Sequence, residues 1–191
     1  GRTLYLNGDP GLSGSVPESQ GDAASPMWIQ KVYGDFSCTD DQTTTSLSVV
    51  PVLFPTAIHN TSGVTVEDNG STGLSRITVS TDGVYEISVT LQGSRATSAG
   101  SADPNIIAFL SKNGIDVPYS AVSQTLTVGT GAVSSQISFS KLLDMESGDY
   151  VEVLWTQIAT AGQDEAILSS AAPFSPFPGV PSAYISVKRI R

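Results

Sequence analysis

The chain offers few residues whose chemistry suits a catalytic or metal site. His59 is its only histidine and Cys38 its only cysteine. A Ser-His-Asp triad needs an activated serine beside the histidine, and the chain has no Gly-x-Ser-x-Gly elbow. The nearest string, GLSGS at 11–15, departs from that pattern at its last position. One histidine and one cysteine cannot supply the usual ligands of zinc. We therefore predict no catalytic residue, no cofactor and no metal.

Carboxylates are more numerous, but their spacing does not suit paired acid–base chemistry. Adjacent pairs occur at 40–41, 67–68 and 164–165. Neighbouring side chains of a strand point to opposite faces, so the middle pair cannot share one proton. Asp144, Glu146 and Asp149 occupy a polar turn in which carboxylates could converge on calcium, without the alternating ligands of a calcium loop. Because Asp and Gly are ordinary turn formers, a plain turn is the preferred interpretation.

The composition is acidic and poor in charge. The 191 residues carry nine basic and 18 acidic side chains, for a formal net charge of −9, and 14% of them are charged. Nucleic-acid binding depends on clustered Lys and Arg, so no nucleic-acid partner is expected. A basic cluster at the C-terminus, 188–191, is interpreted as a solvated strand end. No apolar run is long enough to span a bilayer, and the first residues lack the order of a signal peptide, so no membrane insertion is expected.

The segment that best indicates the fold class is 137–157, ISFSKLLDMESGDYVEVLWTQ. Two runs with period-2 alternation flank a polar turn containing glycine, which predicts a β-hairpin. The side chains expected to face one core are Ile137, Phe139, Val151, Val153 and Trp155. With a single cysteine no intrachain disulfide can form, so stability must come from packing or assembly.

Further strand-like runs follow one another with turn signals about every ten residues. Strands are predicted at 27–36, 46–54, 64–68, 74–80, 83–93, 105–112, 121–128, 132–143, 149–159 and 182–190. Turn dipeptides occur at 69–70, 82–83, 113–114 and 148–149. No window shows sustained helical periodicity. The sequence therefore predicts an all-β protein, a ten-stranded jelly-roll sandwich spanning 27–191.

Residues 1–26 have a different texture, rich in Gly, Ser, Pro and Asp. Their one apolar patch is Leu4, Tyr5 and Leu6. Such a segment cannot bury enough surface to fold alone, so we expect an extended N-terminal arm that becomes ordered against a neighbour. The alternative is a flexible linker with an accidental apolar patch. A second unusual segment, 160–181, has a polar start followed by the apolar, proline-rich SSAAPFSPFPGVP, whose prolines forbid a regular ladder there.

Taken in order, four elements of the chain resemble the tumour-necrosis-factor-like jelly roll, specifically the complement-type globular head. The resemblance rests on ITVSTDGVYEISVTL (77–91), with Gly83 and Tyr85 at its most recognisable positions, IIAFLSKNGIDV (106–117), GDYVEVLW (148–155) and SAYISVKRI (182–190). It covers about residues 30–191. The arm and the 160–181 segment have no counterpart in that family.

The resemblance implies a compact homotrimer in which apolar strand faces meet along a threefold axis. The residues agree, because Tyr150 and Leu154 are apolar on the face of their strand opposite Val151, Val153 and Trp155, and a strand apolar on both faces needs cover on both. The predicted trimer contacts are Tyr150, Leu154, Tyr85, Ile87 and Val89. Alternatively, the 160–181 segment covers the second face within one chain.

These features favour a virion structural protein, a trimeric phage or viral fibre, spike or capsid-decorating subunit on the particle surface. Residues 1–26 would attach it to other virion proteins, such as a capsid or tail component. A second hypothesis is a binding module that recognises a host-surface glycan or protein. A glycan-active enzyme ranks lowest, because no carboxylate pair is suitably placed.

Overall fold

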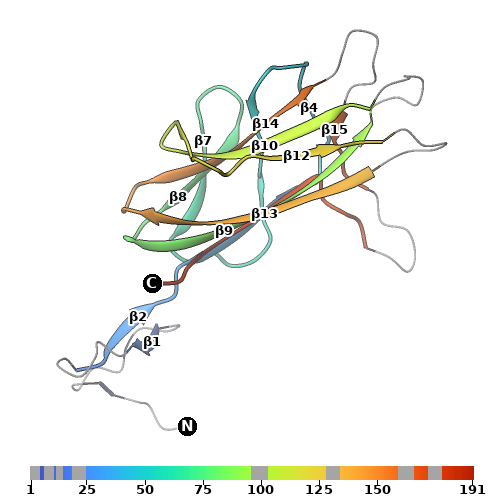
Figure 1. Cartoon of the computed structure of the whole chain (residues 1–191). Coiled ribbons are helices and arrows are strands. Elements are labelled where there is room, and N and C mark those ends of the chain that lie inside the picture. The colour runs from blue at the N-terminus through green and yellow to red at the C-terminus, as the bar shows by residue number, and fades with distance from the viewer. Residues whose placement is uncertain are drawn as a thin grey trace. The chain divides into compact units, whose positions relative to one another are not determined.

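The computed structural model divides the chain into two compact units, residues 1–32 and 33–191. The residues that the structure describes are 5–6, 11, 15–18, 25–95, 103–127, 134–158, 166–171 and 178–191. Figure 1 shows that strands make up the described secondary structure of both units. Among these residues no helix has the length and apolar character required to cross a membrane.

The N-terminal unit contains a two-stranded antiparallel sheet. Strand β1 (Ser15–Glu18) pairs with β2 (Met27–Gln30). Gly11 adopts a left-handed conformation with φ of 71°, and a Cβ built on it would lie 2.6 Å from the Trp28 ring. Only glycine fits beneath this ring. The division into compact units falls after residue 32, and the single strand predicted at 27–36 is two strands, one in each unit.

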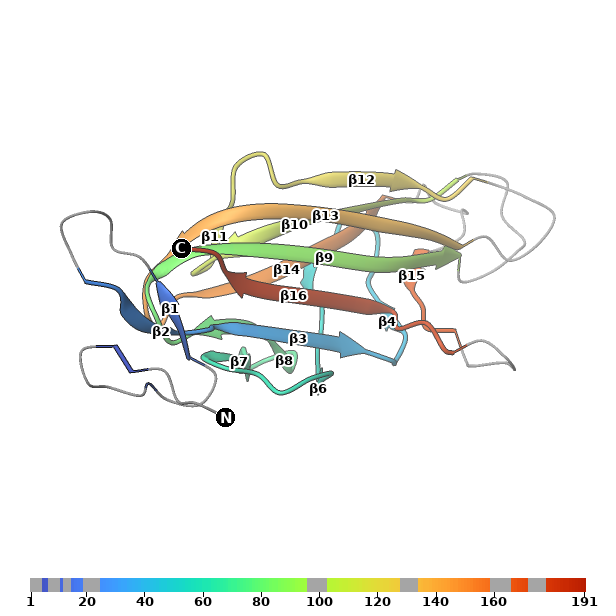
Figure 2. The same ribbon diagram turned by 90° about the horizontal axis from the view of Figure 1, so that it is seen from below.

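The second unit, which we call the head, is built from two mainly antiparallel sheets. The principal strands of the first sheet lie in the order β7 (Val64–Asp68), β8 (Leu74–Val79), β14 (Tyr150–Ile158), β10 (Asn105–Lys112) and β12 (Val122–Thr125). Those of the second sheet lie in the order β13 (Ser134–Met145), β9 (Gly83–Arg95), β16 (Ala183–Arg189) and β3 (Tyr33–Cys38). Figure 2 shows the second sheet in front, with β10, β14, β8 and β7 behind it.

Short strands extend both sheets. Strands β5 (Val50–Pro51) and β11 (Ile115–Asp116) belong to the first, and β4 (Gln42–Thr43), β6 (Thr56–Ala57) and β15 (Ala166–Leu168) belong to the second. Strand β15 lies inside the segment 160–181, where no regular pairing was predicted. Conversely, the strand predicted at 46–54 is reduced to the two residues of β5.

The antiparallel pairs are nested along the chain. Among the principal strands of the head other than the short β7, the first pairs with the last, β3 with β16. Moving inward along the chain, β8 pairs with β14, β9 with β13, and β10 with β12. Two further pairings, β9 with β16 and β10 with β14, join these pairs into the two sheets. The chain is thus folded like a long hairpin whose pairs alternate between the sheets.

The predicted hairpin at 137–157 is wrong. Strand β13 pairs with β9 in the second sheet, whereas β14 pairs with β10 in the first. The turn at 148–149 crosses between the sheets, as does the turn at 82–83 that joins β8 to β9. The turns at 69–70 and 113–114 do form hairpins, β7–β8 and β10–β11. A turn dipeptide marks a chain reversal, but it does not specify whether the next strand remains in the same sheet.

The core fills the space between the sheets. The largest side chains buried there are Trp155, Tyr85, Phe54, Ile77, Ile87, Leu91, Ile106, Leu110, Leu126, Leu168 and Ile185. Val151 and Val153 are also fully buried, Ile137 is nearly so, and Phe139 is half-buried. The prediction that these residues share one core is confirmed, although their strands lie in opposite sheets. An all-β sandwich is what the structure shows.

Candidate interaction surface

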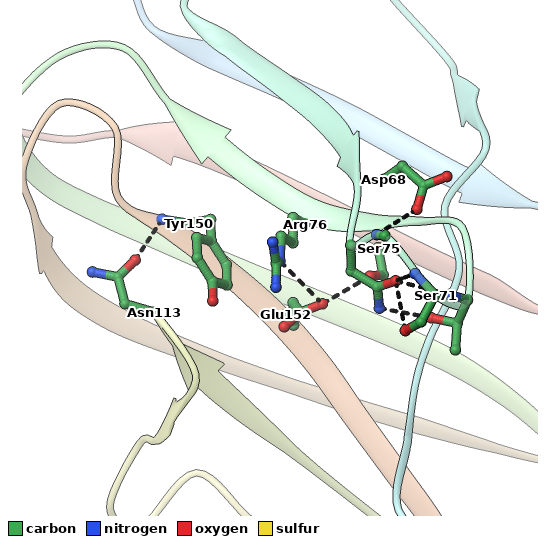
Figure 3. Close-up of polar contacts among 10 residues, drawn as sticks. Asp68, Ser71, Ser75, Arg76, Asn113, Tyr150 and Glu152 are labelled. Carbon is green, nitrogen blue, oxygen red and sulfur yellow. Dashed lines mark hydrogen bonds and ion pairs between the residues drawn. The ribbon is translucent and has the colours of Figure 1, made fainter.

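One end of the head is held by an ionic clasp between two turns, which we define as Lys112, Asn113 and Asp149. Lys112 Nζ lies 2.8 Å from Asp149 Oδ2, and Asn113 Nδ2 donates to Oδ1 of the same carboxylate at 2.7 Å. Figure 3 shows the return bond, in which the Tyr150 backbone N–H donates to Asn113 Oδ1 at 3.0 Å. Asn113 is left-handed with φ of 51°, as a tight Asn-Gly hairpin requires. The clasp explains why Lys-Asn-Gly and Gly-Asp both stand out in the sequence.

The clasp keeps Asp149 ionised. Hydrogen bonds from Lys112, from the Glu146 backbone N–H at 2.8 Å and from Asn113 lower the pKa of its carboxyl from 3.8 to about 2. Both carboxylate oxygens therefore already accept hydrogen bonds from protein donors. This supports the interpretation of 144–149 as a structural turn. Among the residues that the structure describes, no group of three or more His, Cys, Asp or Glu side chains is placed to hold a metal ion.

Next to the clasp, a β-bulge turns a serine toward a buried carboxylate. On β7, Glu67 and Asp68 pair with Arg76 and Leu74 of β8, which leaves Ser75 without a partner in that ladder. A bulge re-aims the extra side chain. Ser75 Oγ donates to Glu152 Oε1 at 2.8 Å, and both residues are buried (Figure 3). The apparently solvent-facing Glu152 is thus part of the internal hydrogen bonding of the sheet.

Tyr150, one of the predicted trimer contacts, is covered by its own chain. The Arg76 guanidinium carbon stands 4.5 Å from the centre of the Tyr150 ring, within range of a cation–π interaction. Arg76 Nε lies 3.9 Å from Glu152 Oε1, which is an ion-pair distance but too long for a hydrogen bond. Figure 3 shows Arg76 between the ring and the carboxylate. Tyr150 is half-buried under this arginine, so less of it is available to another chain.

Leu154, the second predicted contact, belongs to an uncharged apolar area. It pairs with Phe109 of β10 on one side and with Pro51 of β5 on the other. Cross-strand partners share a face, so all three point outward from the first sheet. The outward side of the sheet therefore has two parts, a charged one around Glu152 and an apolar one around Leu154.

The other three predicted contacts, Tyr85, Ile87 and Val89, lie in the core of a single head and are almost fully buried there. They are therefore not on a face that another chain can reach. Most outward positions of the same strand are polar, namely Glu86, Ser88, Thr90 and Gln92. Tyr85 Oη donates to the Thr81 carbonyl at 2.7 Å, and burial, the largest influence, raises the pKa of this phenol. The alternating apolar side chains of β9 therefore pack in the core of the head.

The outward side of the second sheet carries an apolar hollow. The hollow has a volume of about 630 Å³ and is lined by Ser37, Thr39, Ile58, Ser170, Ala171, Gly179, Val180 and Pro181. Its lining mixes hydroxyl groups with apolar side chains and contains no charge. Such a lining suits a neutral ligand or an apolar side chain better than an ionised group.

The predicted arm contacts are only partly described. Tyr5 is 59% exposed and Leu6 is half-buried, whereas Leu4 lies outside the described residues. The N-terminal unit therefore leaves the Tyr5 side chain accessible to a partner. The two residues with reactive side chains offer no site in the described structure: His59 is exposed in an irregular connection, and Cys38 is buried with its thiol directed at the Asp40 carbonyl.

The surface residues that sequence reasoning missed are Ile107 and Phe109 of β10 and Leu47 and Val49 beside β14. The run IIAFL is apolar on both faces of its strand. The same signal singled out Tyr150 and Leu154, so it could also have identified the outward residues of β10. No comparable signal marks Leu47, because its exposure depends on a turn set by long-range contacts.

No protein-family model matches the chain, and no curated protein matches it.

Proposed function

We propose that this chain is a virion structural protein, a trimeric fibre, spike or capsid-decorating subunit whose head is a tumour-necrosis-factor-like jelly roll of the complement type. The nested strand pairing is the observation that carries the fold part of the proposal. In a jelly roll, a long antiparallel hairpin is wrapped into two sheets, and the pairs β3–β16, β8–β14, β9–β13 and β10–β12 follow that scheme.

The assembly part of the proposal rests on the apolar area around Leu154. A face that is apolar on the outside gains free energy when another chain covers it, at about 25 cal/mol per Å². Leu154 remains a proposed trimer contact and Tyr150 an auxiliary one at its charged border. A chain without a disulfide gains stability from such a contact.

The attachment part rests on the division into two units. The N-terminal unit has its own paired strands and its own Gly11–Trp28 contact, and it presents Tyr5 to solvent. We propose that it binds another virion protein while the head projects outward.

The experiment compares the full chain with a variant lacking residues 1–32. Sedimentation equilibrium gives the number of protomers, and co-expression with the structural proteins of the particle tests incorporation. We expect both proteins to form trimers and only the full chain to join the particle. A monomeric full chain would contradict the assembly proposal, and normal incorporation of the shortened chain would contradict the attachment proposal.

A second candidate function is host recognition, and the uncharged hollow beside Val180 and Pro181 favours it. Its hydroxyl and apolar lining is compatible with a neutral glycan. Binding to a panel of neutral glycans that is lost in Val180→Asp but retained in the full-length parent would support it. Enzymatic activity on a glycan ranks below both hypotheses, because Asp149 and Glu152 accept hydrogen bonds from donors of their own chain.

A further inference from the structure

The apolar area around Leu154 extends well beyond the residue that drew attention to it. On β10, Phe109 lies opposite Leu154 and Ile107 lies opposite Thr156. On the other side of β14, the segment 46–52 runs along the strand edge: Ser46 forms a bridge with Gln157, and Pro51 pairs with Leu154. This segment adds Leu47, which is 73% exposed, and Val49, which is 50% exposed, while Ile158 at the end of β14 is 43% exposed.

We call this surface the distal patch. It consists of Leu47, Val49, Pro51, Ile107, Phe109, Leu154 and Ile158.

Hydrogen bonds from buried polar groups hold Leu47 in this exposed position. Leu47 has φ of 61°, a left-handed conformation that is unfavourable for a bulky residue. Its N–H donates to the Gln157 carbonyl at 2.8 Å. The fully buried Gln157 side chain then fixes the neighbourhood, since its Oε1 accepts from the Ala166 N–H at 2.6 Å and its Nε2 donates to the Thr44 carbonyl. Backbone strain held in place by the surrounding structure is a recurrent feature of functional surfaces.

The distal patch is also free of charge. No Asp, Glu, Lys or Arg occurs in 42–66, in 105–111 or in 153–158, which are the segments that supply it. The nearest charged side chain on the outward side of β14 is Glu152, and that carboxylate is buried against Ser75 and Arg76. The described segments that form the patch therefore combine apolar side chains with no charged residue of their own.

We infer that the distal patch is the surface on which a second copy of this chain docks. This inference rests on the proposed assembly and names its contact surface. The charge of the chain indicates the partner: at a net charge of −9, two copies repel each other, and the repulsion is smallest where neither presents a charge. A basic partner would instead be attracted to an acidic face. The outward side of β9 is less suitable for association. Docking there would remove water from the polar side chains of Ser88, Thr90 and Gln92 while burying little apolar area.

The chain offers a matched pair of substitutions that tests this inference. Leu47→Asp places a charge in the patch, and Asp tolerates the left-handed conformation better than Leu does. Tyr119→Asp is the control, because Tyr119 is likewise left-handed, with φ of 57°, and 99% exposed, but it lies in the connection from β11 to β12. Circular dichroism checks the fold of each variant, and sedimentation equilibrium measures self-association.

We expect Leu47→Asp to weaken self-association by at least about tenfold, as for a buried contact that acquires an unpaired charge, and Tyr119→Asp to leave it unchanged. If Leu47→Asp does not fold, Val49→Asp provides the same test. A parent chain that is monomeric would refute the proposed assembly and this inference together. A parent that assembles, with Leu47→Asp and Val49→Asp assembling equally well, would refute the distal patch alone; loss of assembly in Thr90→Asp would then assign the contact to the second sheet.

Discussion

Phe109 on β10 lies directly opposite Leu154 on β14, and both side chains are on the outward side of the first sheet. A half-buried apolar pair in this position contributes little to the head by itself, because the core lies on the other side of both strands. It is, however, the centre of an uncharged surface that ends at Glu152. One face of β10 and β14 thus closes the sandwich, and the other is the face that we propose for association.

The clasp around Asp149 predicts acid sensitivity. The folded-state pKa of about 2 lies below the usual value of 3.8, so the stabilisation is complete above pH 3.8 and is lost as the pH falls toward 2. We expect Asp149→Asn to lower the free energy of unfolding by about 1.5–3 kcal/mol at neutral pH, which is the range for hydrogen bonds to a charged group. Urea unfolding at a series of pH values measures both effects, and the difference from the parent should shrink below pH 3.8.

The control for this experiment is Asp116→Asn, on the exposed strand β11. It removes the same charge without touching the clasp, and its stability should follow the parent at each pH. Equal losses in the two variants would mean that net charge, rather than the contacts with Lys112 and Asn113, sets the acid response.

The contacts of Arg76 predict a coupled pair. Arg76→Met removes the cation beside a nearly buried carboxylate, and we expect it to cost about 1–3 kcal/mol in the free energy of unfolding. Glu152→Gln keeps an acceptor for Ser75 and should cost less. The double variant should cost less than the two single costs together, because the uncompensated charge is gone. Chemical denaturation of the four proteins gives the coupling free energy between Arg76 and Glu152. Strictly additive costs would show that this ion pair does not stabilise the fold.

Gln157 should be far more sensitive to substitution than an exposed glutamine. Gln157→Met nearly preserves the side-chain volume but leaves the Ala166 N–H and the Thr44 carbonyl without a partner, at about 1–3 kcal/mol for each unsatisfied group. We also expect faster amide exchange at Leu47, because the turn loses its support. Gln136→Met, at an exposed position of β13, is the matched control and should behave as the parent. A stable Gln157→Met variant would show that water or a shifted turn replaces the lost bonds.

Each unit contains one of the two tryptophans, which allows the units to be monitored separately. Gly11→Ala would place a methyl group against the Trp28 ring, so we expect a change in Trp28 fluorescence with no change in the unfolding temperature of the head, reported by the buried Trp155. Gly70→Ala, in the β7–β8 turn at φ of 85°, should do the opposite and destabilise only the head. Simultaneous changes in both reporters would mean that the two units unfold together.

Much of the head could be predicted from local patterns. The strands at 64–68 and 105–112 were predicted with the bounds that the structure gives, and most of the long strands were placed to within a few residues. These predictions succeed because consecutive residues of a strand face opposite sides of the sheet, so that apolar and polar residue types alternate along the sequence. The shared core of Val151, Val153 and Trp155 followed from the same alternation.

Local patterns in the chain thus identify it as all-β and locate most of its long strands and its reversals of direction. The sheet that each strand joins depends on the folded structure, in which the β13–β14 turn is a crossover and Tyr85, Ile87 and Val89 belong to the core. The folded structure also determines that Tyr150 lies beneath Arg76 and that Leu47 is held exposed by Gln157. The reason is physical: periodicity is a local property of the chain, whereas the partner of a strand and the cover over an apolar face are set by residues far away in the sequence, whose contacts form only when the two sheets close on each other.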